Sequence, residues 1–381
     1  MPEAAAGHPG LSDILGQDRA VSTLLEAFAA GRLHHAWIFS GPAGVGKATT
    51  ALAFASLILD PTTAPDLTGR IAPDPDSTVQ RLLAAGTHPD LHVITKELAL
   101  LSSSTELRDR KLTNIPIDVL RERMIGGWTG PADSPRFFES IVGKASMMGH
   151  NKVFIIDEAE LLQEGAQNAL LKTVEEPPPD TFIFLITASE DRLLPTMRSR
   201  CRRVGFNALD EKAMKVWFER AQLDLAPDER RWIEWFAAGS PGRALIAAET
   251  GLFNWAKELT PLLDDLDRPR PRVDAMLGQT MATLVQDWAE AQVKGNRSAS
   301  KEAANHLASD LMVWMLSERT RGRLREAASR RGPHNPEVAR CLNMLEAIAD
   351  ARRHMHANVS PQFVFENLAA RLGSPADPSL F

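Results

Sequence analysis

The chain has 381 residues, of which 44% are hydrophobic and 24% charged, so it can fill two or three domain cores and is neither wholly disordered nor a membrane protein. Its 43 Lys and Arg residues against 49 Asp and Glu residues give a net charge of −6, which excludes a protein that coats DNA through overall basicity. Its two cysteines, Cys201 and Cys341, lie far apart and exclude a disulfide scaffold or thiolate zinc module. The first ten residues show no signal-peptide pattern, so we expect a cytoplasmic protein.

Helical and strand patterns alternate in the first half of the chain. Apolar residues at helical spacing or in buried runs predict three helices, at 17–30, 47–59 and 166–175, and four strands, at 36–39, 91–95, 153–156 and 181–187. Proline, aspartate, threonine and serine are frequent between 61 and 130, where we expect a loop-rich excursion. Strands that alternate with helices imply an α/β fold with a mostly parallel sheet covered on both faces.

The second half is predicted to be entirely helical. Helical periodicity runs from residue 211 to the end, with glycine and proline interruptions at 239–242 and 267–272. The last helix, at 361–372, has one apolar stripe, which fits core packing and a subunit contact equally well: Val364, Phe365, Leu368, Ala369 and Leu372. Arginines between 319 and 331 are more typical of a solvated helix face than of a phosphate-binding surface.

A glycine-rich loop joins the first strand to the helix at 47–59. Four of its residues have the spacing of a phosphate-binding loop, in which backbone N–H groups cradle a polyphosphate and the lysine reaches the β and γ oxygens: Gly41, Gly44, Gly46 and Lys47. Ala48 stands where an intact loop has the hydroxyl that binds Mg²⁺. Thr49 is one residue late, which on a helix turns its side chain by about 100° away from the metal position. We therefore expect ATP and Mg²⁺ binding to be weak or lost.

A pair of acids, Asp157 and Glu158, ends the strand at 153–156. Beside a phosphate loop, the aspartate would hold Mg²⁺ through water and the glutamate would polarise the attacking water. The alternative is that both acids only terminate the strand and cap the next helix. Because the acid pair stands next to a phosphate-binding loop that lacks its Mg²⁺-binding hydroxyl, we expect ATP hydrolysis by this chain to be weak or absent.

Two further stretches resemble the signature of the AAA+ clamp-loader subunits, which open ring-shaped sliding clamps and place them on primed DNA. Residues 168–178 read NALLKTVEEPP, and residues 193–201 read LLPTMRSRC. Together with GQ at 16–17 and HAWIFSGP at 35–42, they extend the resemblance over roughly residues 10 to 250. The resemblance implies an α/β AAA+ core at 1–205, a small helical lid at 206–250 and an all-helical collar at 251–381 that joins subunits into a ring-like hetero-pentamer.

The triplet Ser199, Arg200 and Cys201 resembles the SRC motif of this family, whose arginine reaches the γ-phosphate of ATP on a neighbouring subunit. The resemblance implies a trans-acting arginine finger at Arg200, and the alternative is an ordinary surface arginine. Cys201 is expected to be a small buried side chain and not a nucleophile, since no base is evident near it.

Two differences on the nucleotide face indicate the kind of clamp-loader subunit. Ala48 replaces the hydroxyl, and Gly242 replaces the arginine of the Gly-Ser-x-Arg lid element, with Arg243 one place later. Because Arg200 is kept, the chain is similar to the delta-prime type of bacterial DNA polymerase III subunit more than to the gamma or tau ATPases. That likeness implies gamma/tau and delta partners, contact with the clamp and primed DNA through the complex, and no polymerase active site. The alternative is a gamma/tau-like ATPase that uses Lys47, Asp157, Glu158 and either Thr49 or a water.

Many family members carry a four-cysteine zinc module after the first helix, and this sequence has none. The family's ending of glycine, any residue, His-Pro-Asp is kept as Gly86, Thr87, His88, Pro89 and Asp90. His88 and His92 are four residues apart, but the proline between them breaks a helix and no further ligand type is clustered nearby. We therefore expect neither zinc nor another resident metal.

Overall fold

The computed structural model describes residues 10–31, 33–65, 69–102, 104–108, 113–130, 133–266, 276–294, 301–331, 336–356 and 359–373. The chain divides into two compact units, one of Met1–Gln222 with Gly239–Arg243 and one of Leu223–Ala238 with Ala244–Phe381. This division differs from the predicted boundaries after residues 205 and 250. It places helix α8 (Glu211–Ala221) in the first unit, and the three-domain division stays a prediction.

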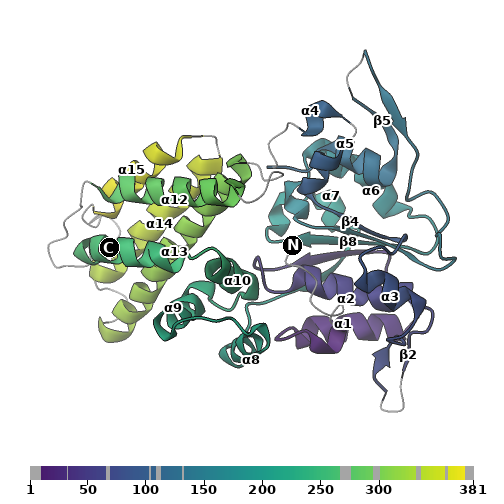
Figure 1. The fold of residues 1–381 in the computed structure, drawn as a ribbon, viewed down its shortest axis with the longest axis horizontal. Coiled ribbons are helices and arrows are strands. Elements are labelled where there is room, and N and C mark those ends of the chain that lie inside the picture. Colours follow the sequence, from purple (N-terminus) through teal and green to yellow (C-terminus); the bar gives the residue numbers. More distant parts are fainter. Residues whose placement is uncertain are drawn as a thin grey trace. The chain divides into compact units, whose positions relative to one another are not determined.

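A five-stranded parallel sheet forms the centre of the first unit (Figure 1). Its strands follow the order β4 (Leu91–Ile94), β7 (Lys152–Ile156), β8 (Thr181–Thr187), β1 (Ala36–Ser40) and β9 (Arg202–Gly205), and each neighbouring pair is parallel. Strand β7 is buried throughout because its apolar side chains are covered on both faces. The predicted α/β class is confirmed.

Helices cover both faces of this sheet. Figure 1 shows α1 (Asp18–Ala29), α2 (Lys47–Leu59) and α3 (Thr78–Ala84) on one side, and α5 (Ile117–Leu120), α6 (Glu164–Glu175) and α7 (Pro195–Arg198) on the other. Phe54 of α2 lies edge-on to Phe184 of β8, with 5.9 Å between the ring centroids. This contact is part of the core that joins the helix after the glycine loop to the sheet.

The stretch from 61 to 130 is more regular than expected. Its described residues include α3, a 3₁₀ turn at Lys96–Leu101, α4 (Thr105–Arg108) and α5, which continues into a π-helical turn at Arg121–Ile125. Two hairpins are added, formed by β2 (Ala64–Pro65) with β3 (Ile71–Ala72) and by β5 (Gly127–Thr129) with β6 (Arg136–Phe138). Residues 66–68, 103 and 109–112 of this stretch lie outside the described residues.

The secondary-structure elements that the structure describes in the second unit are all helices, as predicted. The unit contains α9 (Pro227–Ala237), the later part of α10 (Pro241–Glu249), α11 (Phe253–Leu266), α12 (Leu277–Lys294), α13 (Lys301–Arg331), α14 (Pro336–His356) and α15 (Pro361–Leu372). The apolar stripe of α15 is buried, and this helix packs on α12 and α14, so core packing accounts for the stripe. None of the described helices is long and apolar enough to cross a membrane.

Candidate nucleotide loop and arginine site

The glycine loop connects the end of β1 to the start of α2, as predicted. Gly41, Gly44 and Gly46 have positive φ angles of 149°, 75° and 98°. A Cβ atom at Gly41 would lie 2.2 Å from the carbonyl oxygen of Phe206, so the backbone after β9 leaves no room for a side chain there. The loop is thereby held against the edge of the sheet.

The lysine of this loop bonds to the loop itself. Lys47 Nζ donates hydrogen bonds to the carbonyl oxygens of Gly41 at 2.7 Å and Pro42 at 2.6 Å. The residue is buried, with 6% of its surface exposed. Its ammonium group therefore has protein acceptors at the place where a phosphate-binding loop offers the lysine to a polyphosphate.

A segment from more than 190 residues later packs on the glycine loop, and we call it the clasp (Gly239–Arg243). Ser240 Oγ donates to the carbonyl oxygen of Ala43 at 2.9 Å, and the Gly242 N–H donates to that of Gly44, also at 2.9 Å. A Cβ atom at Gly242 would lie 2.8 Å from Gly44 Cα. Glycine at this place therefore lets the clasp touch the loop, and an arginine there would require the loop to move.

Two charged residues that sequence analysis did not assign act on Lys47. Burial lowers the pKa of Lys47 to about 8, Glu160 and Asp157 oppose this, and Arg243 adds to it. Arg243 stands one place after the position of the lid arginine in the sequence, and the clasp brings its charge close enough to Lys47 to act on the lysine. Glu160 follows β7 on the 3₁₀ turn Ala159–Leu161, and its Oε1 accepts a hydrogen bond from the Ala188 N–H at 3.0 Å. The sequence signal that could have identified Glu160 is a third acid shortly after Asp157 and Glu158.

The lowered pKa of Lys47 predicts how stability changes with pH. Between pH 8 and 10.5 the unfolded chain still binds the lysine proton and the folded chain does not, so the free energy of unfolding rises with pH. Relative to Lys47→Met, the wild type should gain on the order of 3 kcal/mol across this range. Urea unfolding of both chains at pH 7 to 10.5 measures the difference. A constant difference between them would contradict this assignment.

The two threonine hydroxyls that follow Lys47 lie in different surroundings. Thr49 is exposed on α2, and Ala48 before it is half-buried. Thr50 is buried, and its Oγ1 donates to the carbonyl oxygen of Gly46 at 2.8 Å. A nucleotide-binding role for Thr49 stays a prediction.

The two acids after β7 lie in different surroundings. Asp157 Oδ1 accepts a hydrogen bond from the Glu158 N–H at 2.9 Å, and burial raises the pKa of Asp157, against an opposing effect of Lys47. Glu158 Oε2 forms an ion pair with Lys96 Nζ at 2.7 Å, and burial raises the pKa of Glu158 while Lys96 lowers it. The structure thus brings Asp157 into the electrostatic range of Lys47 and holds Glu158 with Lys96, which sequence analysis missed.

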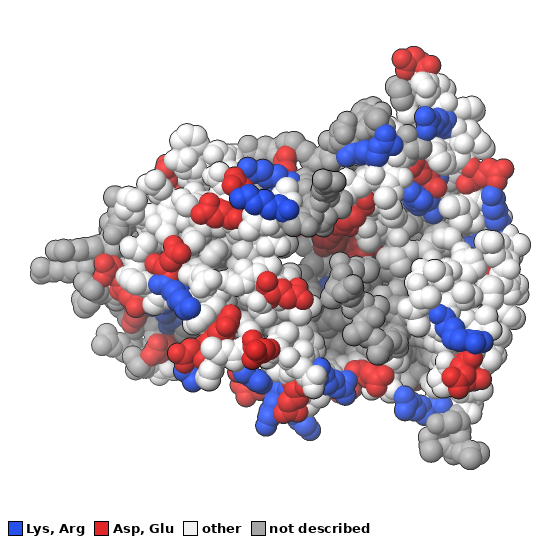
Figure 2. Space-filling view, viewed as in Figure 1, with Lys and Arg blue, Asp and Glu red and all other residues white. Residues whose placement is uncertain are grey.

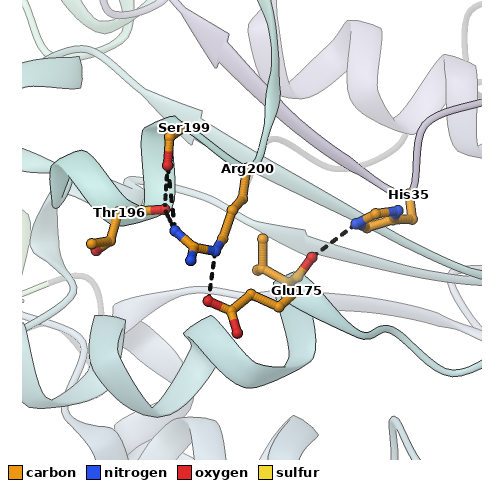
Figure 3. A network of polar contacts seen from close by, with 6 residues as sticks. His35, Glu175, Thr196, Ser199 and Arg200 are labelled. Atoms are coloured by element: carbon orange, nitrogen blue, oxygen red, sulfur yellow. Dashed lines mark hydrogen bonds and ion pairs between the residues drawn. The ribbon is translucent and has the colours of Figure 1, made fainter.

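Arg200 lies between α7 and β9 in a separate polar network (Figure 3). Its Nε is 2.6 Å from Glu175 Oε1, and its Nη1 donates to the carbonyl oxygen of Thr196 at 2.9 Å. The Arg200 side chain is 39% exposed. An exposed arginine fits a group that acts on another molecule, and its role in trans stays a prediction.

The surroundings of Cys201 and of the two histidines, His88 and His92, indicate structural roles. Burial raises the pKa of the Cys201 thiol to about 12, so the thiol stays protonated at neutral pH, as expected for an unreactive cysteine. His88 Nδ1 accepts a hydrogen bond from the Asp90 N–H at 3.2 Å, and His92 stacks on Phe154 with 4.6 Å between ring centroids. Among the described residues, no three His, Cys, Asp or Glu side chains are grouped so as to hold a metal.

A family model and several curated proteins match this chain. The family described as DNA polymerase III, delta subunit, matches residues 16–210. The DNA polymerase III subunit delta' of Pseudomonas aeruginosa is 31% identical over 207 residues, which are 54% of this chain and 53% of that protein. That of Escherichia coli K12 is 29% identical over 229 residues, 58% of this chain and 57% of that protein. Subunit tau of Salmonella typhimurium is 27% identical over 209 residues, 55% of this chain and 27% of that protein.

These alignments span about half or less of the relatives' own length. Among solved structures, a DNA polymerase III gamma subunit-related protein of Thermotoga maritima aligns over 92% of this chain and 98% of that chain, with 16% identity and a TM-score of 0.41. The RuvB Holliday junction branch migration motor of Thermotoga maritima aligns over 76% of this chain and 80% of that chain, with 16% identity and a TM-score of 0.35.

Proposed function

Since the chain belongs to the DNA polymerase III delta-subunit family of clamp-loader proteins, we propose that it is a delta-prime-type subunit that helps to load the sliding clamp onto primed DNA. In this role it does not hydrolyse ATP and supplies Arg200 to the ATP of a neighbouring subunit. The observation that carries this proposal is the contrast between its two sites. Lys47 is buried against its own loop under the clasp, whereas Arg200 is exposed.

The proposed partners are gamma/tau-type and delta-type subunits in a cytoplasmic hetero-pentamer. Contact with the clamp and with primed DNA is made through this complex. On the face shown in Figure 2, lysine and arginine side chains alternate with aspartate and glutamate side chains over the described surface. Together with a net charge of −6, this mixed surface favours DNA contact through the assembled complex over binding by this chain alone.

The second candidate is a gamma/tau-like subunit that binds and hydrolyses ATP itself. One observation favours it: Lys47 still lies in the electrostatic range of Asp157 and Glu160, which is the charge arrangement that Mg²⁺ and a phosphate would use. Against it stand Ala48, the hydrogen bonds of Lys47 to its own loop and the ion pair of Glu158 with Lys96.

Calorimetry of the purified chain with ATP and Mg²⁺ separates the two candidates. We expect no heat of binding at millimolar ATP, because binding would have to break the contacts of Lys47 and of the clasp with the loop. Lys47→Ala is the matched control for any heat observed. Saturable ATP binding that disappears in Lys47→Ala, together with ATP hydrolysis at the same site in the complex, would favour the second candidate.

A further inference from the structure

A carboxylate lies against the arginine that the proposed function assigns to a neighbour. Glu175 is the last residue of α6, and its Oε1 contacts Nε of Arg200 at 2.6 Å. Nη1 of the same guanidinium donates to the Thr196 carbonyl oxygen at 2.9 Å and approaches Ser199 Oγ at 3.4 Å. In Figure 3, the remaining nitrogen, Nη2, has no contact with the residues drawn. The guanidinium is thus held through two of its three nitrogens.

The stability of α6 gives no reason for a carboxylate at this place. The last carbonyl groups of a helix carry partial negative charge, which repels an acidic side chain in the last turn. Glu176 adds a second acid directly after the helix, and Lys172 is the basic residue of the last turn. An alanine at 175 would suit the helix at least as well, so the carboxylate points to a need outside the helix.

The backbone that carries Glu175 is firmly anchored. Val174, the residue before it, is fully buried. Its carbonyl oxygen lies 2.8 Å from Nε2 of His35, next to the start of β1. A side chain on such a fixed backbone can hold its partner in one orientation more precisely than one on a mobile loop.

We propose that Glu175 is the positioning residue for Arg200, holding its Nε so that the free N–H groups of the guanidinium face phosphate oxygens on a neighbouring subunit. This inference rests on the proposed function. An arginine side chain has many rotamers, and one that is already oriented loses less entropy when it reaches the transition state. The ion pair of Arg200 with Glu175 is weak in water because both side chains are about two-fifths exposed. The same ion pair becomes stronger where a subunit contact excludes water.

The test uses the full chain assembled with gamma/tau-type and delta-type subunits, with Glu175→Ala in this chain only. We expect kcat for ATP hydrolysis at the neighbouring site to fall about three- to tenfold and KM to change less than about twofold, because orientation is felt mainly in the transition state. Glu175→Gln keeps an oxygen that can accept from Nε and should restore most of the rate. Glu176→Ala removes the same charge one residue away and should leave the rate unchanged.

A double variant separates this inference from the proposed function. Glu175→Ala with Arg200→Ala should be as slow as Arg200→Ala alone, because the carboxylate acts only through the arginine. If Arg200→Ala is slow and Glu175→Ala matches the wild type, the positioning role is overturned and the proposed function stands. A faster Glu175→Ala complex, or one that fails to assemble, would also overturn the positioning role. An unchanged rate for Arg200→Ala would overturn the proposed function itself.

Discussion

Replacing Arg200 by alanine is expected to slow ATP hydrolysis at the neighbouring subunit of the assembled complex by about 10³-fold or more, the usual contribution of an arginine finger. The guanidinium would stabilise charge that develops on the γ-phosphate in the transition state, and alanine has no group that can replace it. The variant chain should fold normally, because Arg200 is 39% exposed and its ion pair with Glu175 lies at the surface. Single-turnover hydrolysis by the reconstituted complex measures the effect.

Arg203 offers a matched control for this experiment. It lies three residues further along, is exposed, and forms an ion pair with Glu190 at 2.9 Å. Arg203→Ala removes the same charge and a comparable surface contact, so it should leave hydrolysis within about twofold of the wild type. Equal losses for Arg200→Ala and Arg203→Ala would point to a general effect of surface charge.

The second large effect concerns stability. Asp90 is 1% exposed, and its two carboxylate oxygens accept hydrogen bonds from the backbone N–H groups of Met147 and Met148, each at 2.8 Å. Asparagine offers one oxygen and turns an NH₂ group toward the other N–H, so two donors face each other and one of the two hydrogen bonds to the buried side chain is lost. We expect Asp90→Asn to lower the free energy of unfolding by about 2–4 kcal/mol.

Urea unfolding with circular dichroism measures this change, and the exposed Asp191→Asn serves as the control. The buried ammonium of Lys152 belongs to the same region: Nζ donates to the carbonyl oxygens of Ile141 and Val142, and Asp90 opposes the lowering of its pKa by burial. The retained His-Pro-Asp sequence thus organises the segment that leads into β7. An Asp90→Asn chain as stable as the wild type would remove this explanation.

The central strands and the glycine loop could be predicted because their signals are local. A buried strand shows as a run of apolar residues, as in 153–156 and 181–187, and a phosphate loop shows as glycines at fixed spacing. Strand β9 could not be found in this way, since of its four residues Val204 alone is buried. An edge strand with one covered side chain has no apolar run to detect.

The contacts that decide the chemistry could not be predicted because they join distant segments. Ser240 and Ala43 form a hydrogen bond although they are 197 residues apart in the sequence. Lys96 and Glu158 form an ion pair although the β5–β6 hairpin lies between them in the sequence. Arg243 looked displaced by one residue when counted along the chain, yet the clasp places its charge near Lys47. Spacing along the sequence gives the residue types, and the fold decides which of them meet.

The most direct test compares two variants of this chain in one reconstituted complex, through steady-state ATP hydrolysis in the presence of clamp and primed DNA. The account predicts that Lys47→Ala stays within about twofold of the wild type, while Arg200→Ala loses the hydrolysis at the neighbouring site. The reverse pattern, with Lys47→Ala inactive and Arg200→Ala unchanged, would contradict it and identify this chain as an ATPase in its own right.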